Sequence, residues 1–247
     1  MVRWDGSEMS SKPQRLRVDQ LLSRFGYCSR SEARAWLRRE RVLRGEEILD
    51  DPSERVLASE VLVDGQPVEF PDGLLVAFHK PAGYTCSHDP KDRPMIFEIL
   101  PPRWLARNPV VSPVGRLDKD ATGLLLLTDQ GDLIHEWTSP RHHVPKLYEV
   151  TVEADLPQGL EALFASGTLL LEGETKPCLP ARLEIEGSRN ARIELTEGRY
   201  HQVKRMFASQ GCPVLRLHRT RIGALDLADL AEGQWKPVPP DAIHPTA

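Results

Sequence analysis

The chain has 247 residues, of which 40% are apolar and 28% charged, a balance that fits a folded globular protein and excludes a disordered or fibrous one. Its four cysteines have no C-x-x-C spacing, so we expect reduced thiols and no structural zinc site; they are Cys28, Cys86, Cys178 and Cys212. The polar first fifteen residues and the short longest aliphatic run, Leu124 to Leu127, predict neither a secretory signal nor a membrane anchor, and hence a cytoplasmic protein.

The net charge of −4 argues by itself against a nucleic-acid partner, but the charge is unevenly distributed. Residues 15–44 contain nine arginines and three acidic residues. A second basic excess lies between Thr196 and Gly223, where Glu197 is the single acidic residue. Two basic surfaces on an otherwise acidic chain point to a polyanionic partner.

Residues 1–14 lack periodicity, and we expect them to form a disordered tail. A first helix is predicted from the apolar spacing between Leu16 and Phe25, ended by Gly26, and a second helix from Ser29, where Glu32 completes a capping-box pattern. Short strands are expected at 56–57, 61–63 and 68–70, with an Asp64-Gly65 turn between the last two. A linker at 71–73 then marks the boundary between a first domain, 15–72, and a second, 73–247.

One face of the predicted second helix packs against a core, and another face carries guanidinium groups, because four arginines recur on the helix at helical spacing with few glutamates between them. These are Arg30, Arg34, Arg38 and Arg41. A plain solvated face is the alternative, but it usually carries interleaved acidic residues. We interpret this ridge as a phosphate-binding surface.

In the second domain strands outnumber helices and are mostly joined without crossover helices, which predicts an α+β fold with a mainly antiparallel sheet. Strands are expected at 74–78, 123–128, 147–153, 181–186, 191–195 and 214–218, and helices at 96–100, 132–138, 160–165 and 201–210. The 147–153 strand places Tyr148 on its apolar face. The last helix buries Val203, Met206 and Phe207 and carries Lys204 and Arg205 elsewhere on its circumference.

Asp118 is the first candidate for chemistry, because Gly115-Arg116-Leu117-Asp118 lies between a proline-rich loop and a buried strand that could hold the carboxylate rigidly. An ordinary turn aspartate is the alternative. Residues 118–129 imitate a calcium loop, but the aliphatic run within them and the prolines before them do not fit one. A cation from Lys204 or Arg205 could keep Asp118 ionised, unless these residues form only a structural salt bridge.

Other catalytic patterns are missing from the sequence: it has no glycine-rich phosphate loop with a Walker lysine and no G-x-S-x-G serine. Nucleotide hydrolysis and serine-type acyl transfer are therefore disfavoured. His142 and His143 are adjacent, so their side chains diverge and favour a phosphate-contacting loop over a metal site.

Several stretches of the chain resemble two known families, one in each predicted domain. Residues 17–22, 28–34, 41–45 and 63–65 resemble the S-four type RNA-binding domain, although Arg44-Gly45 stands where that family usually has Asn-Gly. Residues 75–240 resemble a pseudouridine synthase of the RsuA class. The motifs are KPAGY (80–84), GRLDKDATGLLLLTDQGDL (115–133), TSPRHH (138–143), KLY (146–148), TKP (175–177), EGRYHQVKRMF (197–207) and LHRTRIG (217–223).

The resemblance implies catalytic roles for four residues. Asp118 corresponds to the nucleophile, Tyr148 to the tyrosine against the target uracil, Lys204 to the basic partner of the aspartate, and Arg116 to a residue that orders the flipped nucleotide. The resemblance and the charge pattern together indicate nine residues that contact RNA: Arg17, Arg30, Arg34, Arg38, Arg41, Arg141, His142, Arg205 and Arg219. The implied reaction moves the uracil glycosidic bond from N1 to C5 without changing composition, so no cofactor is expected.

The implied partner is ribosomal RNA, most closely small-subunit 16S rRNA at a position of the uridine 516 type. We expect the protein to act as a monomer and to have no membrane partner. Two other functions stay open on the residues alone. One is a non-catalytic RNA-binding or ribosome-assembly protein that uses the arginine helix. The other is a glycosidase-like enzyme, which needs a second placed carboxylate, with Asp120 as the near candidate. Whether Asp118 attacks the sugar or removes a ribose proton is undecided, as is whether free rRNA or an assembled particle is the substrate.

Overall fold

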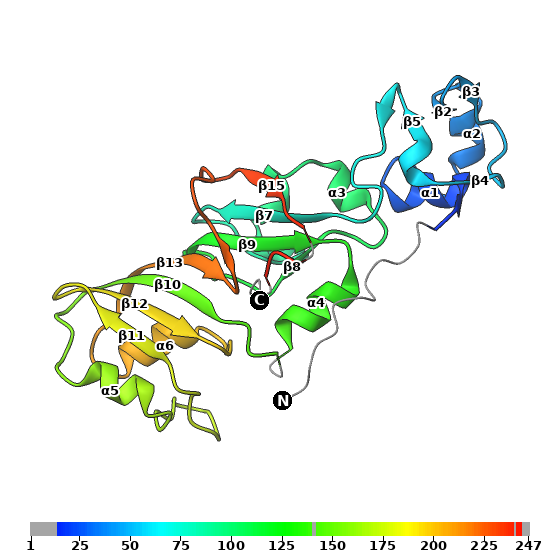
Figure 1. The fold of residues 1–247 in the computed structure, drawn as a ribbon. Helices are drawn as coiled ribbons and strands as arrows, with labels where there is room; N and C mark the ends of the chain where they lie inside the picture. Colours follow the sequence, from blue (N-terminus) through cyan, green and yellow to red (C-terminus); the bar gives the residue numbers. More distant parts are fainter. Residues whose placement is uncertain (1–13, 140–141, 240, 244–247) are drawn as a thin grey trace, which may run out of the picture. The chain divides into compact units, whose positions relative to one another are not determined.

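The computed structural model describes residues 14–139, 142–239 and 241–243, which divide into two compact units (Figure 1). The first unit comprises the described residues up to Leu74 together with Pro101–Val111, and the second comprises Leu75–Leu100 and the described residues from Ser112 onward. The predicted tail, 1–14, falls almost wholly outside the described residues. The α+β fold class predicted from the sequence is confirmed by this arrangement.

The first unit packs short helices against two small sheets. In one sheet, β1 (Leu16–Arg17) pairs with β4 (Arg55–Val56); in the other the order is β3 (Glu47–Ile48), β2 (Val42–Arg44), β5 (Val61–Val63) and β6 (Gln66–Pro67). The helices are α1 (Val18–Arg24), α2 (Ala33–Leu37), the 3-10 turn η1 (Ala58–Glu60) and α3 (Arg103–Ala106). Their core joins fully buried α1 residues such as Leu21 and Leu22 to Leu37 of α2 and Val42 of β2.

Two element predictions in this unit are wrong. The second helix begins at Ala33 and not at Ser29, because residues 29–32 form a separate turn in which the backbone N and the hydroxyl of Ser29 donate to the Glu32 carboxylate at 2.9 and 2.6 Å. Since the helix also ends at Leu37, the expected ridge of four arginines on it is wrong: Arg34 lies on α2, and Arg30, Arg38 and Arg41 lie outside it. The strand expected at 68–70 is instead β6, since the two-residue Asp64-Gly65 turn returns the chain at once and pairs Gln66 with Val63.

The segment 101–111 completes the first unit although it lies far along the chain. Trp104 is fully buried there and donates its indole N–H to Glu69 at 3.2 Å. Gly26, at the end of α1, has a φ of +74°, and a Cβ at this position would lie 2.6 Å from the carbonyl oxygen of Arg103. Glycine is therefore required at residue 26 both by backbone conformation and by the close approach of this segment.

The second unit is built on one mixed sheet, which within the described residues has nine strands. The order along it is β11 (Arg182–Ile185), β12 (Asn190–Leu195), β10 (Lys146–Val152), β13 (Val214–Ile222), β9 (Thr122–Thr128), β7 (Leu75–Lys80) and β15 (Trp235–Pro237), with β14 (Leu225–Asp226) beside β13 and β8 (Ser112–Val114) beside β9. All its pairs of neighbouring strands run antiparallel except β9 and β13, which meet in parallel at Gly123 and Arg219.

Helices cover this sheet at two places. The helix α4 (Gly131–Thr138) buries Leu133 and Trp137 against Leu124 and Leu126 of β9. Further along the sheet, α5 (Leu160–Ala165) and α6 (Gln202–Ala208) meet through Phe164 and Phe207, whose rings pack edge to face at 5.3 Å. The 3-10 turns η2 (Pro90–Asp92) and η3 (Ile96–Ile99) lie in the loop after β7. In the described part of the chain, no helix has the length and apolar character needed to span a membrane.

Candidate active site

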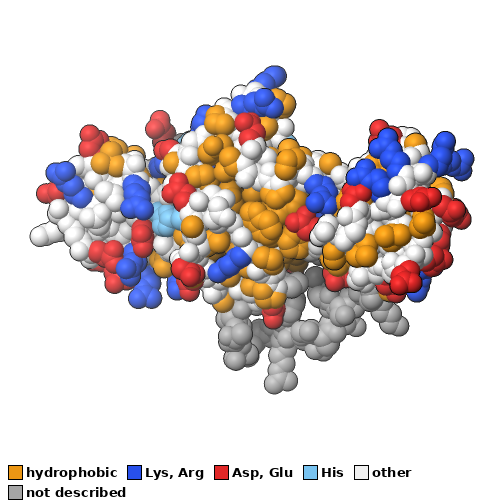
Figure 2. All heavy atoms as spheres, turned by 90° about the horizontal axis from the view of Figure 1, so that it is seen from above, with side chains coloured by type: hydrophobic (Ala, Val, Ile, Leu, Met, Phe, Trp, Pro, Cys, Tyr) orange, Lys and Arg blue, Asp and Glu red, His pale blue; other side chains and the backbone are white. Residues whose placement is uncertain are grey.

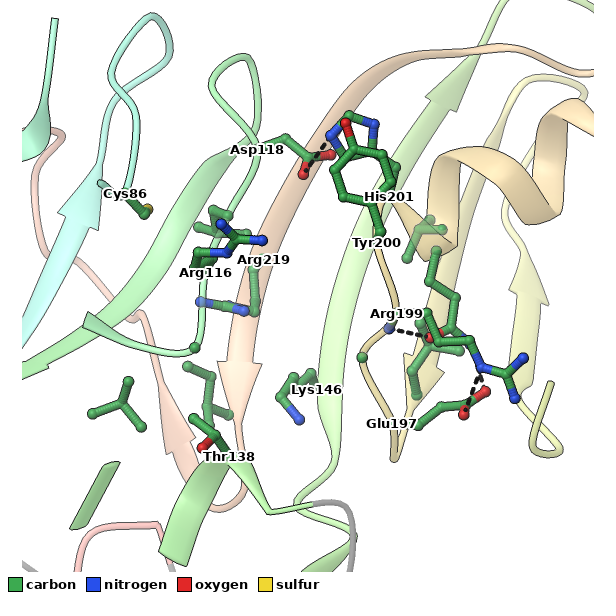
Figure 3. A pocket seen from close by; sticks show the side chains of 18 of the residues that line it. Cys86, Arg116, Asp118, Thr138, Lys146, Glu197, Arg199, Tyr200, His201 and Arg219 are labelled. Atoms are coloured by element: carbon green, nitrogen blue, oxygen red, sulfur yellow. Dashed lines mark hydrogen bonds and ion pairs between the residues drawn. The ribbon is translucent and has the colours of Figure 1, made fainter. Parts of the chain in front are cut away.

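A cavity of about 790 Å³ opens in the second unit, within the range of about 300–1,000 Å³ common for small-molecule sites. Its walls come from the β8–β9 loop, the end of α4, the strands β10 and β13, and the segment before α6 (Figure 3). Arg116, Asp118, Lys146, Tyr148, His201 and Arg219 all line it. Motifs that are up to about a hundred residues apart in the sequence thus contribute to one concave site.

Asp118 lies in the loop between β8 and β9, at the wall of the cavity, with 22% of its side chain exposed. Its Oδ2 atom is 3.2 Å from Nζ of Lys204, and its Oδ1 atom is 3.3 Å from Nε2 of His201. Figure 3 shows the carboxylate and the imidazole turned toward each other. Two basic side chains from the start of α6 therefore hold one carboxylate, as the sequence interpretation required of Lys204.

Lys204 also bridges to a second carboxylate, since its Nζ donates to Oδ1 of Asp120 at 2.5 Å. Partial burial acts to lower the pKa of Lys204, but the hydrogen bond to Asp120 and the charge of Asp118 outweigh it and raise that pKa. The same hydrogen bond lowers the pKa of Asp120. Lys204 is therefore a fixed cation at neutral pH, whereas the Asp120 side chain is 71% exposed and does not line the cavity.

The loop that carries Asp118 is fixed by a buried lysine. Lys80, at the end of β7, is fully buried, and its Nζ donates to the carbonyl oxygens of Pro81, Lys119 and Ala121 at 2.9, 3.2 and 2.8 Å. Burial lowers the pKa of Lys80. A second tie comes from the backbone N of Gly83, which donates to the Lys119 carbonyl at 2.7 Å. The KPAG motif therefore positions the carboxylate through the backbone that directly follows it, at residues 119 and 121.

Tyr148 of β10 is buried, at 8% exposure, and faces Arg219 of β13. The register between β10 and β13 shifts at Leu147 and Tyr148, a bulge that re-aims side chains at this point. Nη1 of Arg219 donates to the Tyr148 hydroxyl at 3.4 Å, and its Nε donates to the carbonyl of Leu124 at 2.7 Å. Arg219 is thus an interior residue, at 2% exposure, that contacts the hydroxyl of Tyr148.

The predicted RNA-contacting residues occupy different environments. Among the described residues, the side chains of Arg34, Arg38 and Arg116 are exposed and have no hydrogen-bond or ion-pair partner. Arg17 and Arg30 contact Asp19, and Arg41 pairs with Asp64 and stacks on Trp36. His142 is exposed, and Arg141 lies outside the described residues. Figure 2 shows lysine and arginine side chains gathered on one side of the first unit, at the right of the view.

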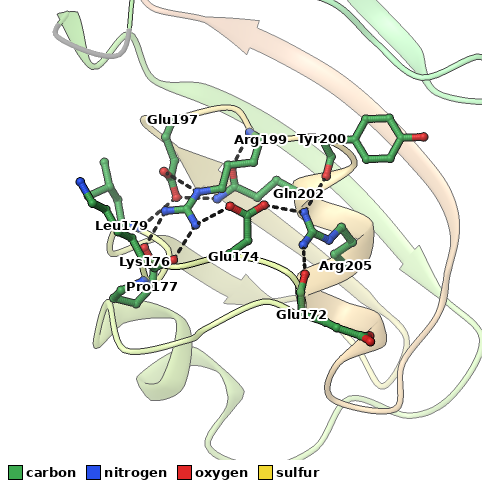
Figure 4. Close-up of polar contacts among 10 residues, drawn as sticks. All are labelled: Glu172, Glu174, Lys176, Pro177, Leu179, Glu197, Arg199, Tyr200, Gln202 and Arg205. Carbon is green, nitrogen blue, oxygen red and sulfur yellow. Dashed lines mark hydrogen bonds and ion pairs between the residues drawn. The ribbon is translucent and has the colours of Figure 1, made fainter.

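Arg205 does not line the cavity, and its guanidinium lies in a polar network (Figure 4). Its guanidinium donates to Glu174 at 2.9 Å and to the carbonyl of Glu172 at 2.5 Å. In the same network Arg199 contacts Glu197 and the carbonyls of Lys176 and Pro177, and the buried Gln202 donates to Glu197 at 2.6 Å. The network anchors the segment before α6, so that Lys204, and not Arg205, reaches Asp118.

Two members of the site were not identified from the sequence. His201 contacts Asp118 from the N-cap position of α6, where its left-handed backbone sets the direction of its side chain, and helical spacing in the sequence does not indicate this. Lys80 was identified only as part of a motif. Its positioning role could not be predicted, because its partners are backbone carbonyls, which no residue pattern indicates. Among the described residues, no group of three histidine, cysteine or acidic side chains is placed to hold a metal ion.

The second unit holds the Asp118 carboxylate by Lys204 and His201 in a cavity that Tyr148 also lines, and the first unit exposes arginines, a combination that favours an enzyme acting on RNA. Comparison with known proteins agrees. The family model for RNA pseudouridylate synthase matches residues 74–209, and the model for the S4 domain matches residues 16–62.

The chain is 39% identical over 233 residues to ribosomal small subunit pseudouridine synthase A of Escherichia coli, which covers 92% of this chain and 98% of that protein. It is 36% identical over 231 residues to the protein of the same name from Pasteurella multocida, with the same coverage. A crystal structure of pseudouridylate synthase superposes with a TM-score of 0.64 at 37% identity, over 92% of this chain and 98% of that one. The chain therefore belongs to the RNA pseudouridylate synthase family and is a pseudouridine synthase, which sets aside the alternatives of a non-catalytic RNA-binding protein and a glycosidase.

Proposed function

We propose that this enzyme isomerises one uridine of small-subunit 16S ribosomal RNA, at a position of the uridine 516 type. The names of the relatives support the small subunit as the source of the substrate. The first unit supports an RNA substrate, because it matches the S4 domain and exposes Arg34 and Arg38 without partners among the described residues. Action as a monomer is part of the proposal.

The proposal gives Asp118 the role of nucleophile, and the observation that carries it is the 3.2 Å contact between Asp118 Oδ2 and Lys204 Nζ at the cavity wall. The Lys204 ammonium holds this carboxylate oxygen by a charge-assisted contact. His201 contacts the other carboxylate oxygen and restricts rotation of the carboxylate. Lys80 acts as a positioning residue through the loop backbone.

The reaction begins when the target uridine leaves its stack and enters the cavity, at a cost of a few kcal/mol that phosphate and stacking contacts offset. Arg116, exposed at the cavity wall, is placed to order the displaced nucleotide. Asp118 then either attacks C1′ of the ribose or removes a ribose proton to give a glycal. In both routes the C1′–N1 bond breaks, and its electron pair goes to the uracil.

The freed uracil rotates against Tyr148 so that C5 faces C1′. The new C1′–C5 bond forms; in the first route it displaces Asp118 from C1′, and in the second the ribose takes its proton back from Asp118. C5 then loses its proton and N1 gains one, so that the composition of the nucleotide is unchanged. The contact of Arg219 with Tyr148 keeps the tyrosine hydroxyl and ring in a fixed position during this rotation.

Mapping of pseudouridine in ribosomal RNA tests this function. RNA from a strain without the gene, and from strains complemented with wild type, Asp118→Asn or Asp120→Asn, is treated with carbodiimide and reverse transcribed. We expect one stop in 16S rRNA to be lost in the deletion strain and restored by wild type and Asp120→Asn, but not by Asp118→Asn. A lost stop in large-subunit rRNA, or restoration by Asp118→Asn, contradicts the proposal.

A further inference from the structure

Tyr200 is an exposed aromatic side chain at the rim of the catalytic cavity that the mechanism above does not use. Its side chain lines the cavity, yet the residue is 69% exposed, the most exposed large hydrophobic residue described in the structure. Its ring stacks on the imidazole of His201, with centroids 4.0 Å apart and an interplanar angle of 16° (Figure 3). One face of the ring is therefore covered, and the other is open to solvent.

The backbone around Tyr200 is fixed by several independent contacts. The Tyr200 carbonyl accepts a hydrogen bond of 3.2 Å from Arg205, and the backbone N of Arg199 donates to Gln202 at 2.9 Å (Figure 4). His201 has a left-handed backbone, with a φ of +48°, and its Nε2 lies 3.3 Å from Asp118. The ring is thus held at a set position relative to the carboxylate, which reduces the entropy lost when a ligand stacks on it.

A flat, open aromatic face in an RNA-modifying site is suited to an unpaired nucleobase. Base–aromatic stacking contributes about 1–3 kcal/mol per base and tolerates any base, because each has a π face. Under the proposed function, removal of the target uridine from its stack leaves the adjacent base without one stacking neighbour. Tyr200 is the residue next to His201, which itself touches Asp118, so the open face lies beside the bound target nucleotide.

We propose that the open face of Tyr200 is a stacking platform for the unpaired base adjacent to the target uridine. This inference rests on the proposed function, since it assumes a uridine bound at Asp118. The platform adds affinity for the opened RNA and little base specificity. The phenolic hydroxyl is not needed for stacking, so phenylalanine at this position preserves the interaction and alanine removes it.

A double-mutant cycle between protein and RNA tests the proposal. Binding to a fragment of 16S rRNA that contains the mapped target uridine is measured for four full-length proteins: wild type, Tyr200→Ala, Tyr200→Phe and Leu215→Ala. The last is a control, because Leu215 is also exposed, at 66%. Each binds the same RNA with an abasic ribose on the 5′ or the 3′ side of the target. Dissociation constants come from fluorescence titration, and product formation is measured in single turnover.

On intact RNA we expect Tyr200→Ala to weaken binding about 5- to 150-fold, and Tyr200→Phe and Leu215→Ala to stay within about twofold of wild type. When the abasic site is on the side of the target that stacks on Tyr200, we expect wild type to bind this RNA more weakly than intact RNA by a similar factor. Tyr200→Ala should then bind the abasic RNA no more weakly than wild type does. Equal binding of intact RNA by wild type and Tyr200→Ala, or independent losses at both flanks, overturns the platform. Failure of the wild-type enzyme to form pseudouridine in this RNA instead contradicts the proposed function.

Discussion

The ammonium of Lys80 donates a 2.8 Å hydrogen bond to the carbonyl oxygen of Ala121, three residues after Asp118. With the bonds to Pro81 and Lys119, it places a buried lysine inside the turn that presents the Asp118 carboxylate. Lys80 and Asp118 are thus linked through the backbone, and the position of the carboxylate depends on a side chain that does not face the substrate.

Replacement of this lysine by an apolar chain of similar length tests the link. In Lys80→Met the loop carbonyls lose their donor, and small displacements of a reacting group are costly, so we expect kcat to fall about 10- to 100-fold. The affinity for RNA stays within about threefold, because Lys80 is buried. Single-turnover rates and binding titrations separate the two effects. Equal rates in wild type and Lys80→Met refute a positioning role.

Gly123 is required where β9 meets β13. Its φ is +108°, and a Cβ there would lie 2.2 Å from the carbonyl oxygen and 2.6 Å from the nitrogen of Arg219, both rigid backbone atoms. Gly123→Ala should lower the free energy of unfolding by more than about 2 kcal/mol. In Gly131→Ala, the matched control, no atom lies within 4 Å of the new Cβ, and the change should stay within about 0.5 kcal/mol. Urea denaturation measures both; similar values for the two variants count against the close approach.

The first unit binds RNA, in our account, through arginines that have no partner within the described part of the protein. Arg34→Gln and Arg38→Gln should each weaken binding and reduce the slope of log affinity against log salt by about 0.7–0.9, the value for one lost phosphate contact. Arg41→Gln should change the slope less, because Arg41 already pairs with Asp64 and stacks on Trp36. Titrations at four salt concentrations give the slopes. Three equal slopes would remove the distinction between paired and unpaired arginines.

Lys146 makes stability depend on pH. Its Nζ lines the cavity and donates to the Val144 carbonyl at 3.0 Å, and burial, with the charge of Arg219, lowers its pKa from 10.5 to about 8. The folded protein therefore releases this proton at lower pH than the unfolded chain does. Between pH 8 and 10.5 the unfolded chain binds more protons, so the free energy of unfolding rises with pH in this window.

Lys146→Met removes both the increase of the free energy of unfolding with pH and the cost of burying the lysine charge. At pH 7 we expect it to raise the free energy of unfolding by roughly 1–2 kcal/mol, a value reduced for the partial exposure of the side chain. The exposed Lys176→Met serves as the control and should leave stability unchanged. Urea unfolding at pH 7 to 10 provides the measurement. A lower stability of Lys146→Met at pH 7, or a difference from wild type that is constant with pH, is the opposite result.

Periodicity was enough to predict the long, regular elements. The helix Leu160–Ala165 was predicted with its observed bounds, and the strand with Tyr148, Val150 and Val152 on one face is β10, where all three are buried. Elements set by local polar bonds or tight turns were less predictable, as with the late start of α2. The return of residues 101–111 to the first unit depends on the burial of Trp104, a long-range contact that no local pattern carries.

The site was predictable in its chemistry and less so in its support. The pairing of a carboxylate with Lys204 followed from residue types and motifs. The inward positions of Arg205 and Arg219 did not, because a sequence shows an arginine's charge but not whether a neighbouring carbonyl or carboxylate already holds it. The Glu172 carbonyl holds Arg205, and the Leu124 carbonyl holds Arg219.

The most direct test of the account is single-turnover release of tritium from RNA labelled at C5 of the target uridine, by wild type and Asp118→Asn. We predict that Asp118→Asn is slower by a factor of about 10⁴ or more, while its affinity for the RNA stays within about threefold of wild type. A rate for Asp118→Asn within about tenfold of wild type would contradict the claim that this carboxylate, held by Lys204 and His201, is the reacting group.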